Sequence, residues 1–282
     1  MPELSNISTI KSILTRYDYR MSKSMGQNFL TDPSVCPKMA DYARGVSSNI
    51  LEIGPGLGVL SVELAKRADK VVSIELDEKL KPILAETLAG YDNIAVIFGD
   101  ALKINLEQII AGNFDNKPVV CANLPYYITS PIIMRLLKMP VSAIIVMVQK
   151  EAARRICAPL GTRECGAVTA AVAYHSTPTK LFDVPRGCFY PVPNVDSSVI
   201  KLELLDSPPV DVDDEKLFFR VIKSAFAQRR KTIHNSISAG LGLPKDVIAA
   251  ALDYCAIPQN ERAERLTLED FARIANRIGT ES

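Results

Sequence analysis

Four consecutive residues that follow the apolar run 118–122 are suited to chemistry on a planar amino group: Asn123, Leu124, Pro125 and Tyr126. The amine of an aromatic base is a poor nucleophile because its lone pair is delocalised into the ring. The Asn123 side-chain oxygen and the Leu124 carbonyl could each accept one amine hydrogen, and Pro125 would hold that carbonyl in place. Tyr126 could stack on the base. The same four residues also suit an ordinary exit from a strand into a loop.

A glycine-rich turn lies upstream, between a predicted strand and a predicted helix. The strand covers residues 48–53, the turn is Gly54-Pro55-Gly56-Leu57-Gly58, and the helix covers 59–67. Glycines let a ligand approach the backbone closely, and a helix N-terminus offers unpaired N–H groups. A dinucleotide-binding fingerprint would need glycine where the chain has Val59, so the spacing is G-x-G-x-G instead. By itself the turn leaves a dehydrogenase and a methyltransferase open.

Carboxylates follow the next two predicted strands. Glu75 closes the apolar run 71–74, where it is placed to accept both ribose hydroxyls of a nucleoside, and Asp100 follows the third strand. Asp100 could accept a hydrogen bond from an adenine amine, cap a helix that begins near Ala101, or do both. Carboxyl ends of parallel strands meet at one edge of a sheet. We therefore expect the glycine turn, the two carboxylates and Asn123 to converge there.

With these residues the chain resembles the ribosomal RNA adenine N6-dimethyltransferases, and within them the bacterial small-subunit (16S) enzymes, nearly from end to end. The G-x-G-x-G turn with Glu52 before it is similar to the first motif of S-adenosylmethionine-dependent methyltransferases. Three further segments carry the resemblance: Gly26-Gln27-Asn28-Phe29-Leu30, Phe189 to Ser197, and the basic Arg229-Arg230-Lys231. Met25 departs from the aromatic residue or leucine expected before this first segment.

The resemblance implies an α/β fold of the Rossmann-like, class I methyltransferase type, with about seven mostly parallel strands and a smaller all-helical C-terminal domain. It assigns binding of the methyl donor, S-adenosyl-L-methionine, to Asn28, Leu30, Gly54, Glu75, Asp100 and Asn123. It assigns the site of the acceptor base to Asn123, Leu124, Pro125, Tyr126 and Phe189. It assigns RNA contacts to Arg229, Arg230 and Lys231.

Some of these residues have simpler interpretations. Phe189 could be a core aromatic that braces a proline-containing loop, Asn28 a turn residue and Leu30 a core residue. Tyr127 is predicted to be structural, because adjacent residues on an extended segment point to opposite sides.

The composition is that of a soluble globular protein with a substantial core: 282 residues, 48% hydrophobic, with a formal net charge of +1. The six cysteines show no C-x-x-C spacing and there are two histidines, so we expect no metal site and free thiols in a reducing compartment. Apolar runs are too short to span a bilayer, and the start lacks a leader-like pattern. We expect a cytoplasmic monomer without membrane contact.

The segment 207–214 has the composition of a linker and separates strand-like from helical patterns. It predicts a methyltransferase domain over 1–206, including an N-terminal donor-binding extension, and a helical RNA-binding domain over 207–282. Between Lys216 and Lys245 the chain has seven basic and no acidic residues. They predict either an exposed stripe that contacts phosphates or a solvated helix face. The last helix is predicted to begin at Thr267.

The predicted reaction is methyl transfer to N6 of adenosine, giving N6,N6-dimethyladenosine. The resemblance implies two adjacent adenosines near the 3′ end of small-subunit RNA as the target, during late subunit assembly. Two alternatives remain: a large-subunit (23S) dimethyltransferase of the macrolide-resistance type, and an assembly factor that acts mainly by binding. The G-Q-N-F-L-T-D opening at 26–32 and the long helical C-terminal part favour the small-subunit enzyme. The intact glycine turn and carboxylates favour catalysis.

Overall fold

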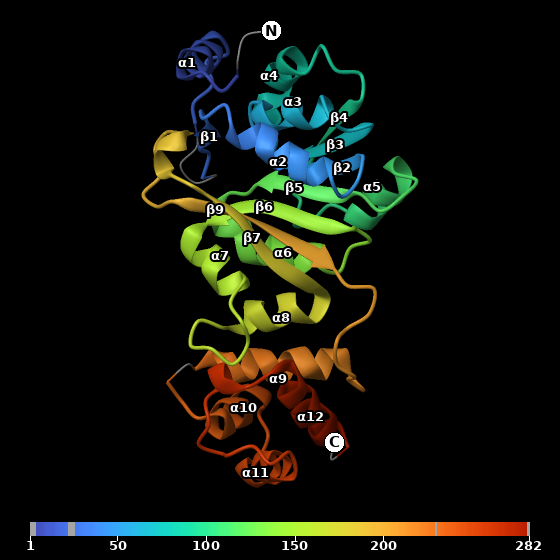
Figure 1. The fold of residues 1–282 in the computed structure, drawn as a ribbon, viewed down its shortest axis with the longest axis vertical. Helices are drawn as coiled ribbons and strands as arrows, with labels where there is room; N and C mark the ends of the chain where they lie inside the picture. Colours follow the sequence, from blue (N-terminus) through green and yellow to red (C-terminus); the bar gives the residue numbers. More distant parts are fainter. Residues whose placement is uncertain (1–3, 22–25, 229, 281–282) are drawn as a thin grey trace. The chain divides into compact units, whose positions relative to one another are not determined.

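The computed structural model describes residues 4–21, 26–228 and 230–280, which belong to two compact units (Figure 1). The first comprises Met1–Ala153 and Pro178–Leu204, and the second comprises Arg154–Thr177 and Leu205–Ser282. The division after Leu204 lies close to the predicted linker. The segment Arg154–Thr177, which the sequence placed in the first domain, joins the helical unit instead, because Ala170 and Tyr174 are buried in the helical core.

The first unit is built on a seven-stranded sheet with the order β4-β3-β2-β5-β6-β9-β7 (Figure 1). The strands are β2 (Asn49–Ile53), β3 (Lys70–Glu75), β4 (Ile94–Phe98), β5 (Val119–Asn123), β6 (Ala143–Gln149), β7 (Ser176–Val184) and β9 (Ser197–Leu204). Pairs from β4 to β6 are parallel and β6 pairs antiparallel with β9. The predicted α/β class and mostly parallel sheet are confirmed. The strand order reverses between β2 and β5, which is where open α/β sheets bind ligands.

Helices cover this sheet on both sides, as its apolar strands require. They are α1 (Ile7–Arg16), α2 (Val35–Arg44), α3 (Val59–Ala65), α4 (Lys81–Thr87), α5 (Leu106–Asn113), α6 (Thr129–Leu136) and α7 (Lys150–Ile156). Met39 of α2 and Leu64 of α3 share a core cluster with strand residues such as Cys121 and Ile145. Helix α1 packs in another cluster with α4, so the N-terminal segment is tied to the edge of the sheet.

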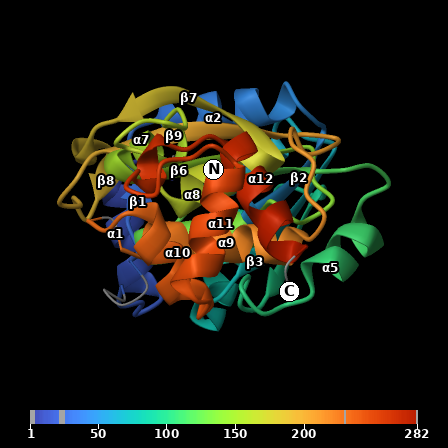
Figure 2. The ribbon, with the colours of Figure 1, turned by 90° about the horizontal axis from the view of Figure 1, so that it is seen from below.

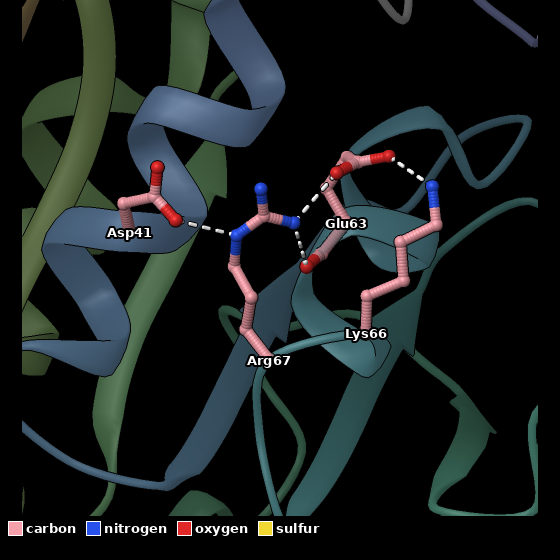
Figure 3. A network of polar contacts seen from close by, with 4 residues as sticks. All are labelled: Asp41, Glu63, Lys66 and Arg67. Atoms are coloured by element: carbon pink, nitrogen blue, oxygen red, sulfur yellow. Dashed lines mark hydrogen bonds and ion pairs between the residues drawn. The ribbon is translucent and has the colours of Figure 1, made fainter.

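A polar network joins the end of α3 to α2 (Figure 3). Arg67 donates from Nε to Asp41 Oδ1 at 2.5 Å and from Nη1 to Glu63 Oε2 at 2.6 Å. Lys66 Nζ donates to Glu63 Oε1 at 2.6 Å. The Asp41 side chain is 67% exposed, so its ion pair contributes at most about 1 kcal/mol. The network orients α3, which follows the glycine turn, while apolar packing supplies most of the stability.

A second, two-stranded sheet brings distant segments of the chain together. Strand β1 (Phe29–Leu30) pairs antiparallel with β8 (Phe189–Tyr190), so that Leu30 lies opposite Phe189. Thr31 N–H extends this pairing by donating to the Cys188 carbonyl at 2.8 Å. The N-terminal motif and the Phe189 to Ser197 segment therefore meet.

The second unit is helical. It contains α8 (Ala167–His175), α9 (Glu215–Ala227), α10 (Ile233–Leu241), α11 (Lys245–Tyr254) and α12 (Leu268–Gly279). Helices α9 and α11 each contact both α10 and α12, so the contacts close a ring of four helices. Figure 2 shows these helices from below. Phe218 and Phe271 are fully buried within this ring. Thr267 Oγ1 accepts the Asp270 N–H while the Asp270 carboxylate accepts the Thr267 N–H, so the predicted helix start is confirmed.

Candidate active site

A cavity of about 330 Å³ opens at the carboxyl ends of β2, β3 and β5. Pockets for small ligands typically measure about 300–1,000 Å³. All ten residues predicted for the donor and the base line it: Asn28, Leu30, Gly54, Glu75, Asp100, Asn123, Leu124, Pro125, Tyr126 and Phe189. We call Gly54–Gly58, Glu75 and Asp100 the glycine-turn half, and Asn123–Tyr126 with Phe189 the tetrapeptide half.

Two glycines of the turn share an unusual backbone conformation but differ in their surroundings. Gly54 has φ +73° and Gly58 has φ +87°, a backbone conformation that residues with side chains rarely adopt. A Cβ on Gly58 would also lie 3.1 Å from Thr87 Oγ1 and 3.3 Å from Leu88 Cδ2. A Cβ on Gly54 would meet no atom within 4 Å, so that side of the turn is open to a ligand.

Backbone N–H groups hold the Glu75 carboxylate in place. Gly56 N–H donates to its Oε2 at 3.1 Å and Asp77 N–H donates to its Oε1 at 2.8 Å. The residue is 6% exposed, and burial raises the pKa of its carboxyl. Asp77 accepts a hydrogen bond from the Tyr19 hydroxyl at 2.6 Å, and Gln27 donates to that hydroxyl at 2.5 Å. Each carboxylate oxygen has a second lone pair, so Glu75 can still accept ligand hydroxyls.

Glu52 lies beneath the turn and is fully buried. Its Oε2 accepts hydrogen bonds from Ser61 Oγ at 2.7 Å and Ser73 Oγ at 2.6 Å, while Oε1 has no partner among the described residues. Burial raises the pKa of Glu52 from 4.5 to about 7. The sequence showed Glu52 only as part of a motif, since the two serines that surround it come from other elements.

Asp100 lines the cavity with its side chain 29% exposed. Its Oδ1 accepts the Leu102 N–H at 2.9 Å. The predicted helix near Ala101 is wrong, because the residues after Asp100 form turns and α5 begins later at Leu106. Asn105 caps that helix by accepting the Gln108 N–H, so Asp100 caps a turn instead.

Several apolar cavity residues were not predicted. Ile53, Leu76 and Leu102 each lie within two positions of a predicted residue and line the cavity. Leu76 is 48% exposed, so a ligand in the cavity could cover it. Their positions one or two residues from Gly54, Glu75 and Asp100 were the available sequence signal.

Asn123 and Asn28 are directly linked. Asn123 Nδ2 donates to the Asn28 carbonyl at 3.4 Å, and Asn28 Nδ2 donates to the Gly26 carbonyl at 3.1 Å. The first bond uses the amide nitrogen of Asn123, which leaves its side-chain oxygen as the acceptor. Leu124 N–H donates to the Met147 carbonyl at 3.3 Å, which fixes the backbone of the tetrapeptide to β6.

The tetrapeptide continues into a short helical turn, the 3-10 helix η3 (Tyr126–Ile128). The Tyr126 hydroxyl shares a hydrogen bond of 2.9 Å with Ser197 Oγ. The prediction that Tyr127 is structural is wrong: the backbone is helical here and not extended, so the alternation argument fails. Tyr127 lines the cavity and is 56% exposed.

Phe189 and Leu30 are core residues that also line the cavity. Each is 2% exposed and belongs to the core cluster that includes Met39. Each also lines the cavity, because β1 and β8 form part of its wall. Core packing therefore fixes the position of the aromatic ring.

Basic residues lie on the surface of the second unit. Lys216, Arg220 and Lys223 are exposed on α9, whose other side buries Phe218 and Ile222. The basic residues of α9 are therefore exposed, as both sequence interpretations require. Arg230 and Lys231 are exposed, and Arg229 lies outside the described residues.

A family model described as ribosomal RNA adenine dimethylase matches residues 19–280. The chain belongs to this family. Two relatives are each named ribosomal RNA small subunit methyltransferase A. That of Alkaliphilus metalliredigens (strain QYMF) is 44% identical over 283 residues and covers 99% of both chains. That of Geobacillus thermodenitrificans (strain NG80-2) is 45% identical over 277 residues, covering 95% of this chain and 94% of the relative.

Solved structures agree with membership of the ribosomal RNA adenine dimethylase family. A dimethyladenosine transferase from Plasmodium falciparum aligns with a TM-score of 0.73 at 27% identity, covering 89% of this chain and 98% of that one. The 23S rRNA methyltransferase ErmE aligns with a TM-score of 0.66 at 26% identity, covering 89% and 99%. Within the described ranges, no group of three His, Cys, Asp or Glu residues could hold a metal ion, and no helix is long and apolar enough to cross a membrane.

Proposed function

We propose that the protein transfers methyl groups from S-adenosylmethionine to N6 of two adjacent adenosines in small-subunit ribosomal RNA, giving N6,N6-dimethyladenosine. The observation that carries the proposal is a cavity that Glu75 and Asp100 line from the ends of β3 and β4, on one side of β2, and Asn123 and Tyr126 line from the end of β5, on the other. A donor and an acceptor of methyl groups can therefore meet within it.

The glycine-turn half suits the donor. Glu75 can accept both ribose hydroxyls, Asp100 can accept the adenine amine, and the open side of Gly54 permits close approach. The donor-binding assignment extends to Asn28 and Leu30, which line the same cavity. When bound, S-adenosylmethionine supplies an electrophilic methyl carbon with a neutral thioether as its leaving group.

The tetrapeptide half suits the target base. The Asn123 side-chain oxygen and the Leu124 carbonyl accept the two N6 hydrogens, which directs the nitrogen lone pair toward the methyl carbon. Tyr126 and Phe189 hold the base by stacking. The bond from N6 to the methyl carbon forms as the carbon–sulfur bond breaks, and the cationic product is acidic enough to release its proton to water. No protein general base is needed.

The small-subunit substrate is supported by sequence identity. Relatives named for the small subunit share 44% and 45% of residues over nearly the whole chain, whereas ErmE, named for 23S rRNA, shares 26%. Exposed basic residues are available for phosphate contacts: Arg230, Lys231 and, on α9, Lys216, Arg220 and Lys223. Because the proposed target is ribosomal RNA in assembling bacterial subunits, the proposed site of action is the cytoplasm. That the protein is a monomer stays a prediction.

Radiolabelled S-adenosylmethionine tests the proposal. The protein is incubated with undermethylated small subunits, with large subunits and naked RNA as controls, and the nucleosides are separated. We expect labelled dimethyladenosine in the small subunit only. Label confined to the large subunit would overturn the substrate assignment. Measurable donor binding with no label in any RNA would contradict catalysis and favour the assembly-factor alternative.

A further inference from the structure

Ser197 touches the proposed stacking residue without lining the cavity. It is the first residue of β9, it is fully buried, and its Oγ lies 2.9 Å from the Tyr126 hydroxyl. A buried hydroxyl without a hydrogen bond costs free energy. The hydrogen bond between Ser197 and Tyr126 removes this cost and is therefore favoured over a state in which the two hydroxyls are apart.

The backbone around Ser197 is fixed. Ser197 lies opposite Gln149 in the antiparallel pairing of β6 with β9. The preceding residue, Asp196, accepts the Lys150 N–H on its carbonyl at 3.0 Å and the Arg186 N–H on Oδ1 at 3.0 Å. The hydroxyl of Ser197 is therefore presented to Tyr126 from a rigid position.

The segment from Phe189 to Ser197 positions both aromatic residues of the tetrapeptide half, Phe189 and Tyr126. At its start, Phe189 is placed by the pairing of β8 with β1. At its end, Ser197 holds the far edge of the Tyr126 ring. Tyr126 itself lies on a short helical turn and is only partly buried, so its ring needs a tether to keep one orientation.

We propose that Ser197 is a positioning residue, whose hydroxyl holds the Tyr126 ring in the orientation that stacks on the target adenine. This inference rests on the proposed function, because it assigns the stacking role to Tyr126. Without the tether the ring samples other rotamers and its hydroxyl bonds to water, so the base is held less often in the reactive position.

Ser197→Ala and Tyr126→Phe each remove one hydroxyl of this pair. In methylation of undermethylated small subunits we expect kcat to fall roughly five- to tenfold in each, the value of about one hydrogen bond, with KM for the subunit and affinity for the donor little changed. The double variant should lose no more than either single variant, because both changes break the same bond. Ser197→Thr keeps a hydroxyl and should restore turnover.

Ser198→Ala is the matched control. Ser198 is the next residue of β9 and is equally buried, but its Oγ donates to Asp183 at 2.7 Å. We expect wild-type kcat from this variant. Combined with Tyr126→Phe, it should give the kcat of Tyr126→Phe alone. Donor affinity and thermal unfolding of every variant establish that it is folded.

Three outcomes would overturn the inference: wild-type kcat in Ser197→Ala, wild-type kcat in Tyr126→Phe, or losses that multiply in the double variant. If Ser197→Ala fails to fold, the kcat of Tyr126→Phe still tests whether the hydrogen bond between the two hydroxyls positions the ring. A wild-type protein that forms no dimethyladenosine would instead overturn the proposed function, which the same assay reveals separately.

Discussion

The glycine-turn half and the tetrapeptide half of the cavity are assembled in different ways. The first comes from the ends of β2, β3 and β4, which follow one another in the chain, and backbone N–H groups hold its central carboxylate, Glu75. The second needs three distant segments, joined by the β1–β8 pairing and by the Tyr126–Ser197 hydrogen bond. The donor half therefore depends on backbone geometry, and the acceptor half depends on a few side-chain contacts.

Asn123→Ala should have the largest effect. The amide oxygen acts where charge develops during methyl transfer, and loss of one such group typically lowers kcat by about 100- to 1,000-fold. Turnover with saturating donor and small subunits measures it. Asn105→Ala is the control, because Asn105 caps α5 away from the cavity and should affect stability alone. Equal kcat in wild type and Asn123→Ala would remove the tetrapeptide half from the chemistry.

Glu75→Ala should weaken donor binding roughly 100-fold, since it removes two hydrogen bonds to a charged group at about 1.5 kcal/mol each. Calorimetric titration with S-adenosylmethionine measures the loss. Glu86→Ala is the control, because Glu86 pairs with Arg16 at the surface and should leave affinity unchanged. Unchanged affinity in Glu75→Ala would mean that the glycine-turn half does not hold the ribose.

Glu52→Gln should change how stability depends on pH. The folded pKa of about 7 lies above the ordinary 4.5, so the folded state binds this proton more tightly and loses stability as pH rises between these values. From pH 5 to pH 7 the wild type should lose about 2 kcal/mol relative to the variant. Denaturant unfolding at both pH values measures the difference. Parallel pH profiles would show that Glu52 stays ionised beneath the turn.

Phe189→Leu should have the smallest effect. Leucine keeps most of the core packing but loses aromatic stacking, so we expect a loss of about 1 kcal/mol in turnover, roughly fivefold, with donor affinity preserved. Phe182→Leu in the same unit is the control, since Phe182 lies outside the cavity. Wild-type turnover in Phe189→Leu would contradict the proposed clamp on the base.

The sequence predicted cavity-lining residues in both halves, but it explained how the half is assembled only for the donor half. Strand ends at Ile53, Glu75 and Phe98 follow from apolar runs, and parallel strands bring successive ends to one edge. The Tyr126–Ser197 bond joins residues 71 positions apart, and no local pattern signals it. Tyr127 was misplaced because a helical turn replaced the expected extended backbone.

For a related reason, the sequence placed the segment Arg154–Thr177 with the sheet and not with the helical unit. Helix α8 consists almost entirely of apolar residues, so its sequence has no polar face that would indicate which core it joins. Only tertiary packing assigns Ala170 and Tyr174 to the helical unit. The strongly amphipathic α12, in contrast, was predicted with its cap at Thr267.

A crystal structure with S-adenosylhomocysteine and an adenosine-containing RNA fragment tests the central claim most directly. It should place the donor ribose on the Glu75 carboxylate and the adenine N6 between the Asn123 side-chain oxygen and the Leu124 carbonyl, with Tyr126 against the base. A nucleoside bound at Glu75 with the RNA adenine outside this cavity would contradict the account.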